Sequence, residues 1–345
     1  MFHISKNVFT EKNKRKTQIF GLAVLLTFML LLPLLASSNY FLFLMLQVFI
    51  NTIIVMGLNI ITGLTGQMHF GTGAIFSLGA YSSAIVTTKL GVSPWIGLLC
   101  AIVMGLIVGI GLGYPGLKVR GVYLWLITIA FNQVVNLLER NMVDLTGGTQ
   151  GIRGIPYFSL FGKELSGSRE IYYLYLALTI FIIYLAWRIC HSRFGRTFRA
   201  IRDNEDSMSA NGIDIAQKKI LAFIISTVFA CFAGSLYAHC YNYITPNAFA
   251  DLSTNYLVMM MVGGIGSIPG CAIGAAVITL LPEYMRGLQQ YYWLIFSVVT
   301  LLMTIFTPKG LISIVTGDLE DSVFSRISFR AQKGGRSNGG HDLKT

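Results

Sequence analysis

The sequence predicts an all-α integral membrane protein with about ten transmembrane helices and both termini in the cytoplasm. Hydrophobic residues make up 54% of the 345 residues and charged residues only 12%, whereas soluble domains carry about 25% charged residues. Residues 17–88 contain no Asp, Glu, Lys or Arg at all. A soluble helix needs a polar face, but about 20 contiguous apolar residues cross a bilayer as a helix. The long uncharged runs therefore favour several membrane spans separated by short turns.

The uncharged runs divide into ten expected helices. The unbroken apolar stretch Phe20–Leu35 favours helices over a β-barrel, whose segments of about 10 residues alternate in polarity. The eighth and ninth helices are short and meet at glycines, so they form either two spans or a re-entrant pair, and eight to ten spans are expected. The expected helices cover residues 18–37, 41–61, 70–88, 94–115, 121–138, 171–188, 219–239, 252–265, 268–282 and 292–308.

The orientation follows from the basic residues in short loops. With the N-terminus inside, 20 of the 26 Lys and Arg residues lie on the cytoplasmic side. The expected organisation is a basic N-terminus (1–17), a transmembrane domain (18–308) with an external loop (139–170) and a cytoplasmic loop (189–218), and a cytoplasmic tail (309–345) whose end is expected to be disordered. The net charge of +11 then reflects contact with lipid headgroups, and nucleic-acid binding is not expected.

The sequence lacks the patterns of an enzyme or of a carrier that supplies its own energy. It contains no phosphate-binding loop of the GxxxxGK[ST] type and no HExxH. Its five histidines are scattered, and its five cysteines are irregularly spaced in or beside apolar runs, as expected for small hydrophobic residues. No carboxylate is expected in the middle of a span. We therefore expect no catalytic residue, cofactor or metal in this chain, and a partner that hydrolyses ATP.

The longest expected cytoplasmic segment between spans, residues 190–219, carries a second pattern. Ala200–Ala210 is expected to form a short helix with Ile201 and Met208 toward one side. Asn211–Gly212 is a typical helix stop, because glycine accepts the left-handed conformation. Such a helix could insert into a groove of a cytoplasmic protein, or it could be an interfacial connector with basic anchors. The residues alone leave both alternatives open.

Two glycine-rich stretches mark expected helix junctions, at residues 57–81 and 263–277. Small residues allow close helix packing, and they also allow broken helices whose backbone groups line a polar path. Gln67 and His69 lie in the first break. The glycines expected at these breaks and close contacts are Gly63, Gly66, Gly71, Gly79, Gly263, Gly264, Gly266 and Gly270.

Five motifs follow one another between about residues 55 and 315. They are GLTGQMHFGTGAIFSLGAY, LKVRGVYLWLITIAFNQV, LTGGTQGIRGIP, FGRTFRAIRDNEDSMSANGIDIAQKKILAFIIS and GGIGSIPGCAIGAAV. In this order they resemble the motifs of the branched-chain amino acid ABC importer permeases, specifically of the longer of the two paired permeases. The chain departs from the family pattern at Met68, His69 and Trp125, and Ser207 and Ser209 replace alanines in the cytoplasmic loop.

The resemblance implies a permease subunit of a bacterial-type inner membrane, paired with a second related permease. Two cytoplasmic ATPase subunits, which hold ATP and Mg²⁺, dock below the pair, and an extracytoplasmic solute-binding protein delivers the solute. The cytoplasmic loop is then similar to the segment that couples the permease to the ATPase. By position, the coupling residues are Arg199, Arg202, Glu205, Asp206, Met208 and Gly212.

A zwitterionic amino acid needs paired polar groups and helix ends rather than a strong charge. Gln67, His69, Asn132 and Gln133 are the candidates for the substrate pathway, with interhelical hydrogen bonds as the alternative reading of each. A related permease for urea or short amides is a second hypothesis for the solute. An ion-coupled carrier or channel and a membrane-embedded enzyme are further alternatives, against which the missing carboxylates, nucleophiles and metal ligands argue.

The expected topology can be tested with reporter fusions. Because basic residues favour the inside by 20 to 6, fusions after Gly195 and after Ala331 should report a cytoplasmic location. A fusion near Gly162 should report an external one. An external signal at Gly195 would overturn the orientation.

Overall fold

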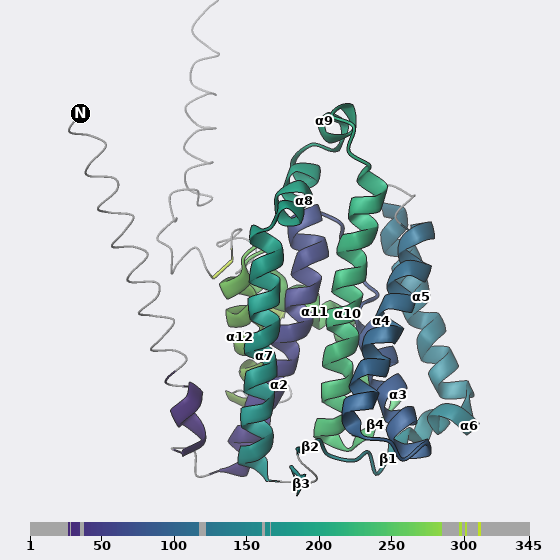
Figure 1. Ribbon diagram of the computed structural model, residues 1–345, viewed down its shortest axis with the longest axis vertical. Coiled ribbons are helices and arrows are strands. Elements are labelled where there is room, and N and C mark those ends of the chain that lie inside the picture. The colour runs from purple at the N-terminus through teal and green to yellow at the C-terminus, as the bar shows by residue number, and fades with distance from the viewer. Residues whose placement is uncertain are drawn as a thin grey trace, which may run out of the picture.

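The structure is a computed structural model that describes residues 27, 29–34, 38–116, 122–160, 163–165, 167–284, 297–298, 301 and 310–311. Within this part the chain is a bundle of long helices (Figure 1). The predicted N-terminus, the predicted C-terminal tail apart from Gly310 and Leu311, and most of the predicted first and last helices lie outside the described residues.

The helices follow the predicted apolar runs. Four are long and apolar enough to cross a membrane, namely those over Asn39–Leu64, Pro94–Tyr114, Ser168–His191 and Ile215–Tyr241. The helical membrane class is therefore confirmed, whereas the number of spans and their orientation stay predictions. The described helices are α2 (Asn39–Leu58), the π-helix η1 (Asn59–Leu64), α3 (Thr72–Lys89), α4 (Pro94–Gly116), α5 (Val122–Asn141), α6 (Val143–Thr146), the 3-10 helix η2 (Gly148–Gln150), α7 (Ser168–His191), α8 (Arg193–Asp203), α9 (Glu205–Ala210), α10 (Ile215–Tyr241), the 3-10 helix η3 (Pro246–Phe249), α11 (Leu252–Gly263) and α12 (Ile268–Tyr284).

Helix α10 is the centre of the bundle. It packs against α2, α3 and α4, with α2, α7 and α12 to one side and α4 and α5 to the other (Figure 1). Glycines bring the neighbouring backbones close, because a Cβ atom on Gly234 of α10 would overlap the Phe76 carbonyl of α3. On the α4 side, the hydroxyl of Thr227 donates to the carbonyl oxygen of Gly105 over 2.8 Å. The bundle therefore depends on close backbone contacts of the kind that small residues allow in membranes.

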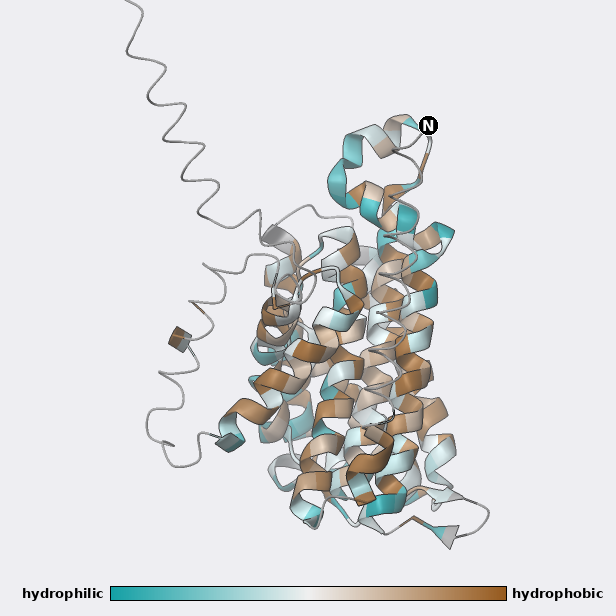
Figure 2. Cartoon of the chain, turned by 90° about the vertical axis from the view of Figure 1, so that its left-hand side faces the viewer, coloured by the Kyte–Doolittle hydropathy of each residue, from teal (hydrophilic) through white to brown (hydrophobic). Residues whose placement is uncertain are grey.

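The two ends of the bundle differ. Hydrophobic residues fill its middle, and hydrophilic residues gather at the α8–α9 end (Figure 2). At the opposite end lie α6 and two short antiparallel pairs (Figure 1). In these pairs β1 (Ile152–Arg153) bonds to β4 (Tyr243–Ile244), and β2 (Ser159–Leu160) to β3 (Lys163–Glu164).

A buried histidine anchors the loop that carries these strands. His239 Nδ1 lies 2.7 Å from the carbonyl oxygen of Pro156, and Nε2 lies 2.9 Å from the hydroxyl of Ser83. Because a carbonyl can only accept, Nδ1 carries the proton and Nε2 accepts from Ser83. The hydroxyl of Ser235 in turn donates to Ser83 over 2.8 Å. This chain of bonds joins α3, α10 and the loop before β2.

Two predicted helices differ in extent from those observed. The predicted helix Ala200–Ala210 is divided into α8 and α9 at Asn204, whose φ of −159° and ψ of 103° are extended rather than helical. Its side chain accepts from the Ser207 N–H over 3.0 Å and so caps α9. The predicted helix 121–138 continues to Asn141, which includes Glu139 in α5.

The length of helix α11 helps to decide whether the predicted eighth and ninth helices form two membrane spans or a re-entrant pair. Its 12 residues rise about 18 Å, which is less than the roughly 30 Å of bilayer hydrocarbon. Helix α11 therefore cannot cross the membrane alone, and this length favours the re-entrant arrangement for that helix.

Close packing of α3 on α10 gives a direct test. A Cβ atom on Gly79 would overlap the backbone of Cys231, whereas one on Gly111 of α4 would meet nothing within 4 Å. Gly79→Ala should therefore destabilise the bundle by about 1–3 kcal/mol, since overpacking forces backbone shifts, and Gly111→Ala should not. Thermal unfolding of both purified variants in detergent measures the difference. Equal melting temperatures would contradict the packing described.

Candidate functional site

The first glycine-rich stretch forms a break between η1 and α3. Gly66 has a φ of +73°, which glycine adopts without strain. The hydroxyl of Thr62 donates to the carbonyl oxygen of Gln67 over 3.0 Å, and that of Thr65 donates to the carbonyl oxygen of Ile61 over 2.6 Å. Side-chain hydroxyls thus supply part of the hydrogen bonding that is lost where a membrane helix is interrupted.

One side of this break lies along α5. The backbone N–H of Phe70 donates to the hydroxyl of Thr128 over 3.0 Å, and the ring centroids of Phe70 and Trp125 are 6.0 Å apart. Gln67 is half-buried and Met68 is 40% exposed. The non-helical segment therefore presents a mixed polar and apolar surface beside α5.

The other predicted pathway residues lie in two places, on helix α5 and against helix α10. Asn132 lies one turn beyond Thr128 on α5 and is half-buried, and Gln133 next to it is exposed. His69 is only 1% exposed, and its ring centroid lies 5.4 Å from that of Phe223 on α10. Within the described residues, neither ring nitrogen of His69 has a hydrogen-bond partner. The structure thus places Gln67 half-buried at the break and turns the His69 ring into the bundle, against α10.

The second glycine-rich stretch meets the first. The backbone N–H of Gly266 donates to Asn59 Oδ1 over 2.7 Å, and a Cβ atom on Gly63 would overlap the same Asn59 side chain. Gly264 and Gly266 have φ values of +124° and +85°, which favour glycine. The turn between α11 and α12 therefore rests on η1, although the two stretches lie far apart in the sequence.

The backbones of helices α11 and α12 lie close together where the two helices meet this turn. The backbones of Gly263 and Gly270 lie so near each other that a Cβ atom on either would overlap the other's carbonyl. In the first stretch, Gly79 packs as closely against α10, but a Cβ atom on Gly71 would lie at an ordinary 3.5 Å from Thr128 Cβ. Gly71 therefore has room for a methyl group, unlike Gly63, Gly79, Gly263 and Gly270.

Arg202 joins both glycine-rich stretches to α8. Its Nη1 donates to the carbonyl oxygen of Gly63 over 2.6 Å. A Cβ atom on Gly66 would lie 3.3 Å from Arg202 Cγ, and one on Gly266 would lie 3.4 Å from Nη1. The end of a helix leaves carbonyl oxygens without intrahelical donors, and the guanidinium supplies one through a charge-assisted hydrogen bond. Helix α8 is thereby bound to the break and lies beside the α11–α12 turn.

Buried side chains fix α8 itself. Phe198 and Ile201 are fully buried, and Arg199 Nη2 donates to the carbonyl oxygen of Cys190 over 2.5 Å. The capping hydroxyl of Ser192 accepts from the Gly195 N–H. Helix α8 is thus held to the end of α7 on one side and to η1 on the other, so its position relative to both is fixed.

Helix α9 is held by an ion pair. Glu205 Oε1 lies 2.6 Å from Lys219 Nζ, with the Lys219 side chain 7% exposed and that of Glu205 33% exposed. Asp206 is exposed and Met208 half-buried. Gly212 has a φ of +76°, and a Cβ atom there would meet nothing within 4 Å. Of the predicted coupling residues, Arg199 and Arg202 therefore lie on α8 and bond to carbonyls of the bundle. The other four lie on α9 or directly after it, with Glu205 turned toward α10.

Glu139 is a buried carboxylate that the sequence prediction puts in the external loop. It is 4% exposed, and its Oε1 accepts from the hydroxyl of Ser77 over 2.6 Å. Its other oxygen, Oε2, has no hydrogen-bond partner within the described residues. Glu139 therefore belongs to the last turn of α5 and not to a loop, and it lies outside the middle of that helix.

A periodic pattern could have indicated this burial. Leu124, Thr128, Val135 and Glu139 are the buried residues of the described α5 side chains, and their spacing keeps them on one helical face. Extending that face by one turn past residue 138 would have included Glu139. No comparable signal identifies Asn59 or Lys219, whose partners lie elsewhere in the chain. No group of three or more His, Cys, Asp or Glu residues in the described ranges could hold a metal ion.

Comparison with known proteins identifies the family. Residues 40–308 match the sequence model of a family described as the branched-chain amino acid transport system / permease component. The high-affinity branched-chain amino acid transport system permease protein LivM of Escherichia coli (strain K12) is 30% identical over 295 residues, which cover 79% of this chain and 69% of that protein. No solved structure matches the chain significantly.

More distant relatives have the same description. A probable branched-chain amino acid transport permease protein LivM of Methanocaldococcus jannaschii is 27% identical over 71% of this chain and 78% of its own length. The permease protein LivH of Salmonella typhimurium is 26% identical over 75% of this chain and 90% of its own length. The chain belongs to the family of branched-chain amino acid transport system permease components.

Proposed function

We propose that this chain is a transmembrane permease subunit of an ATP-driven importer that moves branched-chain amino acids inward. The observation that carries this proposal is the family match over residues 40–308, together with the resemblance to LivM over 79% of the chain. The described helices are compatible with it, because four of them could cross a bilayer. The chain itself performs no catalysis in this proposal.

The proposed assembly contains four kinds of protein. This chain pairs with a second permease, as the separate relatives LivM and LivH suggest. Two cytoplasmic ATPase subunits bind ATP and Mg²⁺, and an extracytoplasmic solute-binding protein delivers the amino acid. The complex lies in the inner membrane, with the α8–α9 end of the bundle facing the cytoplasm.

The α8–α9 segment is the proposed ATPase contact. The exposed carboxylate of Asp206 is available to a partner, while Phe198, Ile201 and the bond from Arg199 to the Cys190 carbonyl fix α8 in the bundle. A force on α8 would reach the break at Gly63 through Arg202 and the α11–α12 turn through Asn59. This physical connection supports coupling between ATP hydrolysis and the opening of a path through the membrane.

The proposed path runs beside the break and α5. Gln67, Asn132 and Gln133 offer neutral amides, and their side chains make no hydrogen bond with other described residues. Neutral groups and interrupted helix ends suit a zwitterion, whose two charges cancel. His69 would contribute only if the break rearranged, since its ring is packed against Phe223.

Leucine uptake tests the function. Proteoliposomes that hold this chain with its second permease and ATPase subunits, supplied with the binding protein, should accumulate radiolabelled leucine when ATP is present. Omission of the ATPase subunits should abolish uptake. Failure to take up leucine, isoleucine and valine, with all subunits present and ATP hydrolysed, would contradict the proposal.

Arg202→Gln should reduce leucine uptake by about tenfold. It removes a charge-assisted hydrogen bond to the Gly63 carbonyl, and such bonds contribute roughly 1.5–3 kcal/mol. Arg193→Gln is the matched control, because Arg193 lies exposed on the same helix. The ratio of leucine imported to ATP hydrolysed should fall only for Arg202→Gln. The same ratio in both variants would contradict the proposed connection between α8 and the break.

A charge exchange tests how Glu205 acts. Glu205→Lys should impair transport several-fold, because it sets like charges together at Lys219 and disturbs α9. The double variant Glu205→Lys with Lys219→Glu should restore most of the uptake if Glu205 positions α9 through this pair. A double variant as impaired as the single one would indicate instead that the Glu205 carboxylate binds the ATPase directly.

A further inference from the structure

A polar cavity lies inside the subunit, on the side of the bundle away from α5. It is enclosed by α2, α10, α11 and α12 and has a volume of about 220 Å³. A cavity of about 150 Å³ is sufficient for a benzene molecule, so this one has room for a solute slightly larger than benzene. Ala248 and Pro282 in its lining are exposed, and the cavity therefore opens to the surface between η3 and α12.

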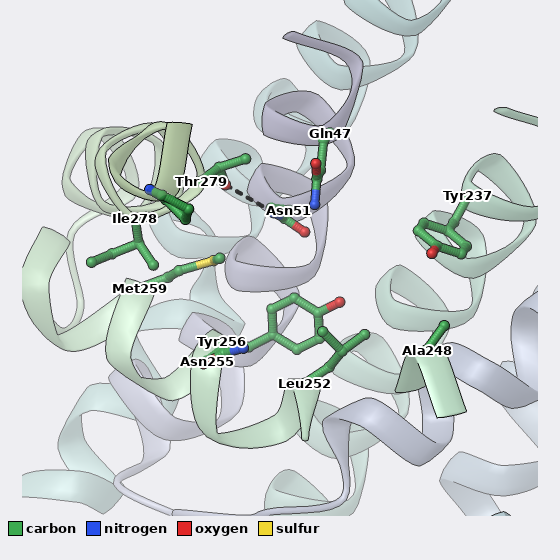
Figure 3. A pocket seen from close by; sticks show the side chains of 11 residues that line it. Gln47, Asn51, Tyr237, Ala248, Leu252, Asn255, Tyr256, Met259, Ile278 and Thr279 are labelled. Carbon is green, nitrogen blue, oxygen red and sulfur yellow. Dashed lines mark hydrogen bonds between the residues drawn. The ribbon is translucent and has the colours of Figure 1, made fainter. Parts of the chain in front are cut away.

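Neutral hydrogen-bonding groups line one part of this cavity. Asn51 uses its amide nitrogen to donate to Thr279 over 2.8 Å, which leaves its amide oxygen as an acceptor. Tyr256 is 2% exposed, and its hydroxyl points into the cavity (Figure 3). This hydroxyl and the half-buried amides of Gln47 and Asn255 bond to no other described side chain or backbone group. Buried polar groups are normally satisfied, so the Tyr256 hydroxyl indicates a polar occupant of the cavity.

The rest of the cavity lining is apolar, and the N-terminal end of helix α11 forms part of it. Leu252, Met259 and Ile278 form the hydrophobic part of the wall. The first two turns of α11 contribute Leu252, Asn255 and Tyr256, and Asp251 gives this helix no side-chain cap. A helix N-terminus carries a partial positive charge that favours a carboxylate. Among the described residues of the lining there is no Asp, Glu, Lys, Arg or His, so this part of the wall offers no counter-ion to a solute with net charge.

We propose that this cavity binds one molecule of a zwitterionic amino acid with a branched apolar side chain. The carboxylate would accept hydrogen bonds from the Tyr256 hydroxyl and the Asn255 amide near the start of α11. The ammonium group would donate to Asn51 Oδ1, and the side chain would pack on Met259 and Ile278. The choice of a branched-chain amino acid rests on the proposed function, whereas the site itself rests on the lining of the cavity.

Binding to the full-length chain in lipid nanodiscs tests the site without the other subunits. Radiolabelled leucine should bind saturably, and Tyr256→Phe and Asn255→Leu should each weaken that binding by about tenfold, because each removes a donor to a charged group. Tyr81→Phe is the matched control, since the Tyr81 hydroxyl is also buried without a partner in the described ranges but lies on α3. Ala248→Trp, at an exposed position on the rim, should exclude leucine without disturbing the core.

Competing solutes then test the chemical class. Leucinol, which lacks the carboxylate, and 4-methylpentanoate, which lacks the ammonium group, should each compete at least tenfold less well than leucine. Glycine should also compete poorly, because it lacks the apolar side chain. Equal competition by urea or by 4-methylpentanoate would overturn the assignment of a zwitterion.

The remaining outcomes separate this proposal from the proposed function. Absence of saturable leucine binding, or leucine binding that Tyr256→Phe, Asn255→Leu and Ala248→Trp all leave unchanged, would overturn the cavity site even if the complete transporter imported leucine. Binding that these three variants weaken, in a chain whose assembled complex imports no branched-chain amino acid, would support the site and contradict the proposed function alone.

Discussion

The hydrogen bond from Arg202 to the carbonyl oxygen of Gly63 is the contact on which the arrangement of the α8–α9 end depends. It joins α8 to a π-helical turn, where the regular backbone bonding of α2 ends. Nearby, the Asn59 side chain holds the Gly266 N–H. Three segments distant in the sequence therefore meet at one point, and only glycine backbones allow so close an approach.

In this arrangement the two glycine-rich stretches have the same structural role. Each supplies a place where helix geometry is interrupted, and the two interruptions face each other across Asn59. A polar backbone group at such a place must be satisfied inside the protein, and Arg202 does so from an element outside the transmembrane helices. In the proposed transporter, a cytoplasmic event that moves α8 would thus act on both interruptions together.

Local patterns of hydrophobic residues and glycines in the sequence predicted much of this fold. Uncharged apolar runs predicted the long helices, and the glycine clusters predicted a break near Gln67 and a sharp turn before α12. The sequence did not indicate the partner of Arg202, because the contact with Gly63 depends on how α8 folds back over the bundle. Asn204 escaped prediction for a related reason, since its capping of α9 competes with the helical propensity of its neighbours. Glu139 was missed because α5 extends one turn past the apolar run.

Two polar regions lie on opposite sides of α10. The break and α5 carry neutral amides on one side, and the cavity beside Tyr256 carries neutral amides and hydroxyls on the other. Neither the described lining of the cavity nor the amides of Gln67, Asn132 and Gln133 carry a charge that would hold a zwitterion strongly, which suits a solute that must be released as well as bound. Glu139, bonded to Ser77, is the exception and lies toward the β1–β4 end.

Hydrogen exchange of the full chain in nanodiscs tests most directly whether Arg202 holds the two interruptions together. Local opening controls amide exchange, so Arg202→Gln should speed exchange in residues 59–67 and 264–267. Exchange in the loop that carries β1 should stay as in the unsubstituted chain. Unchanged protection of residues 59–67 in Arg202→Gln would contradict the account.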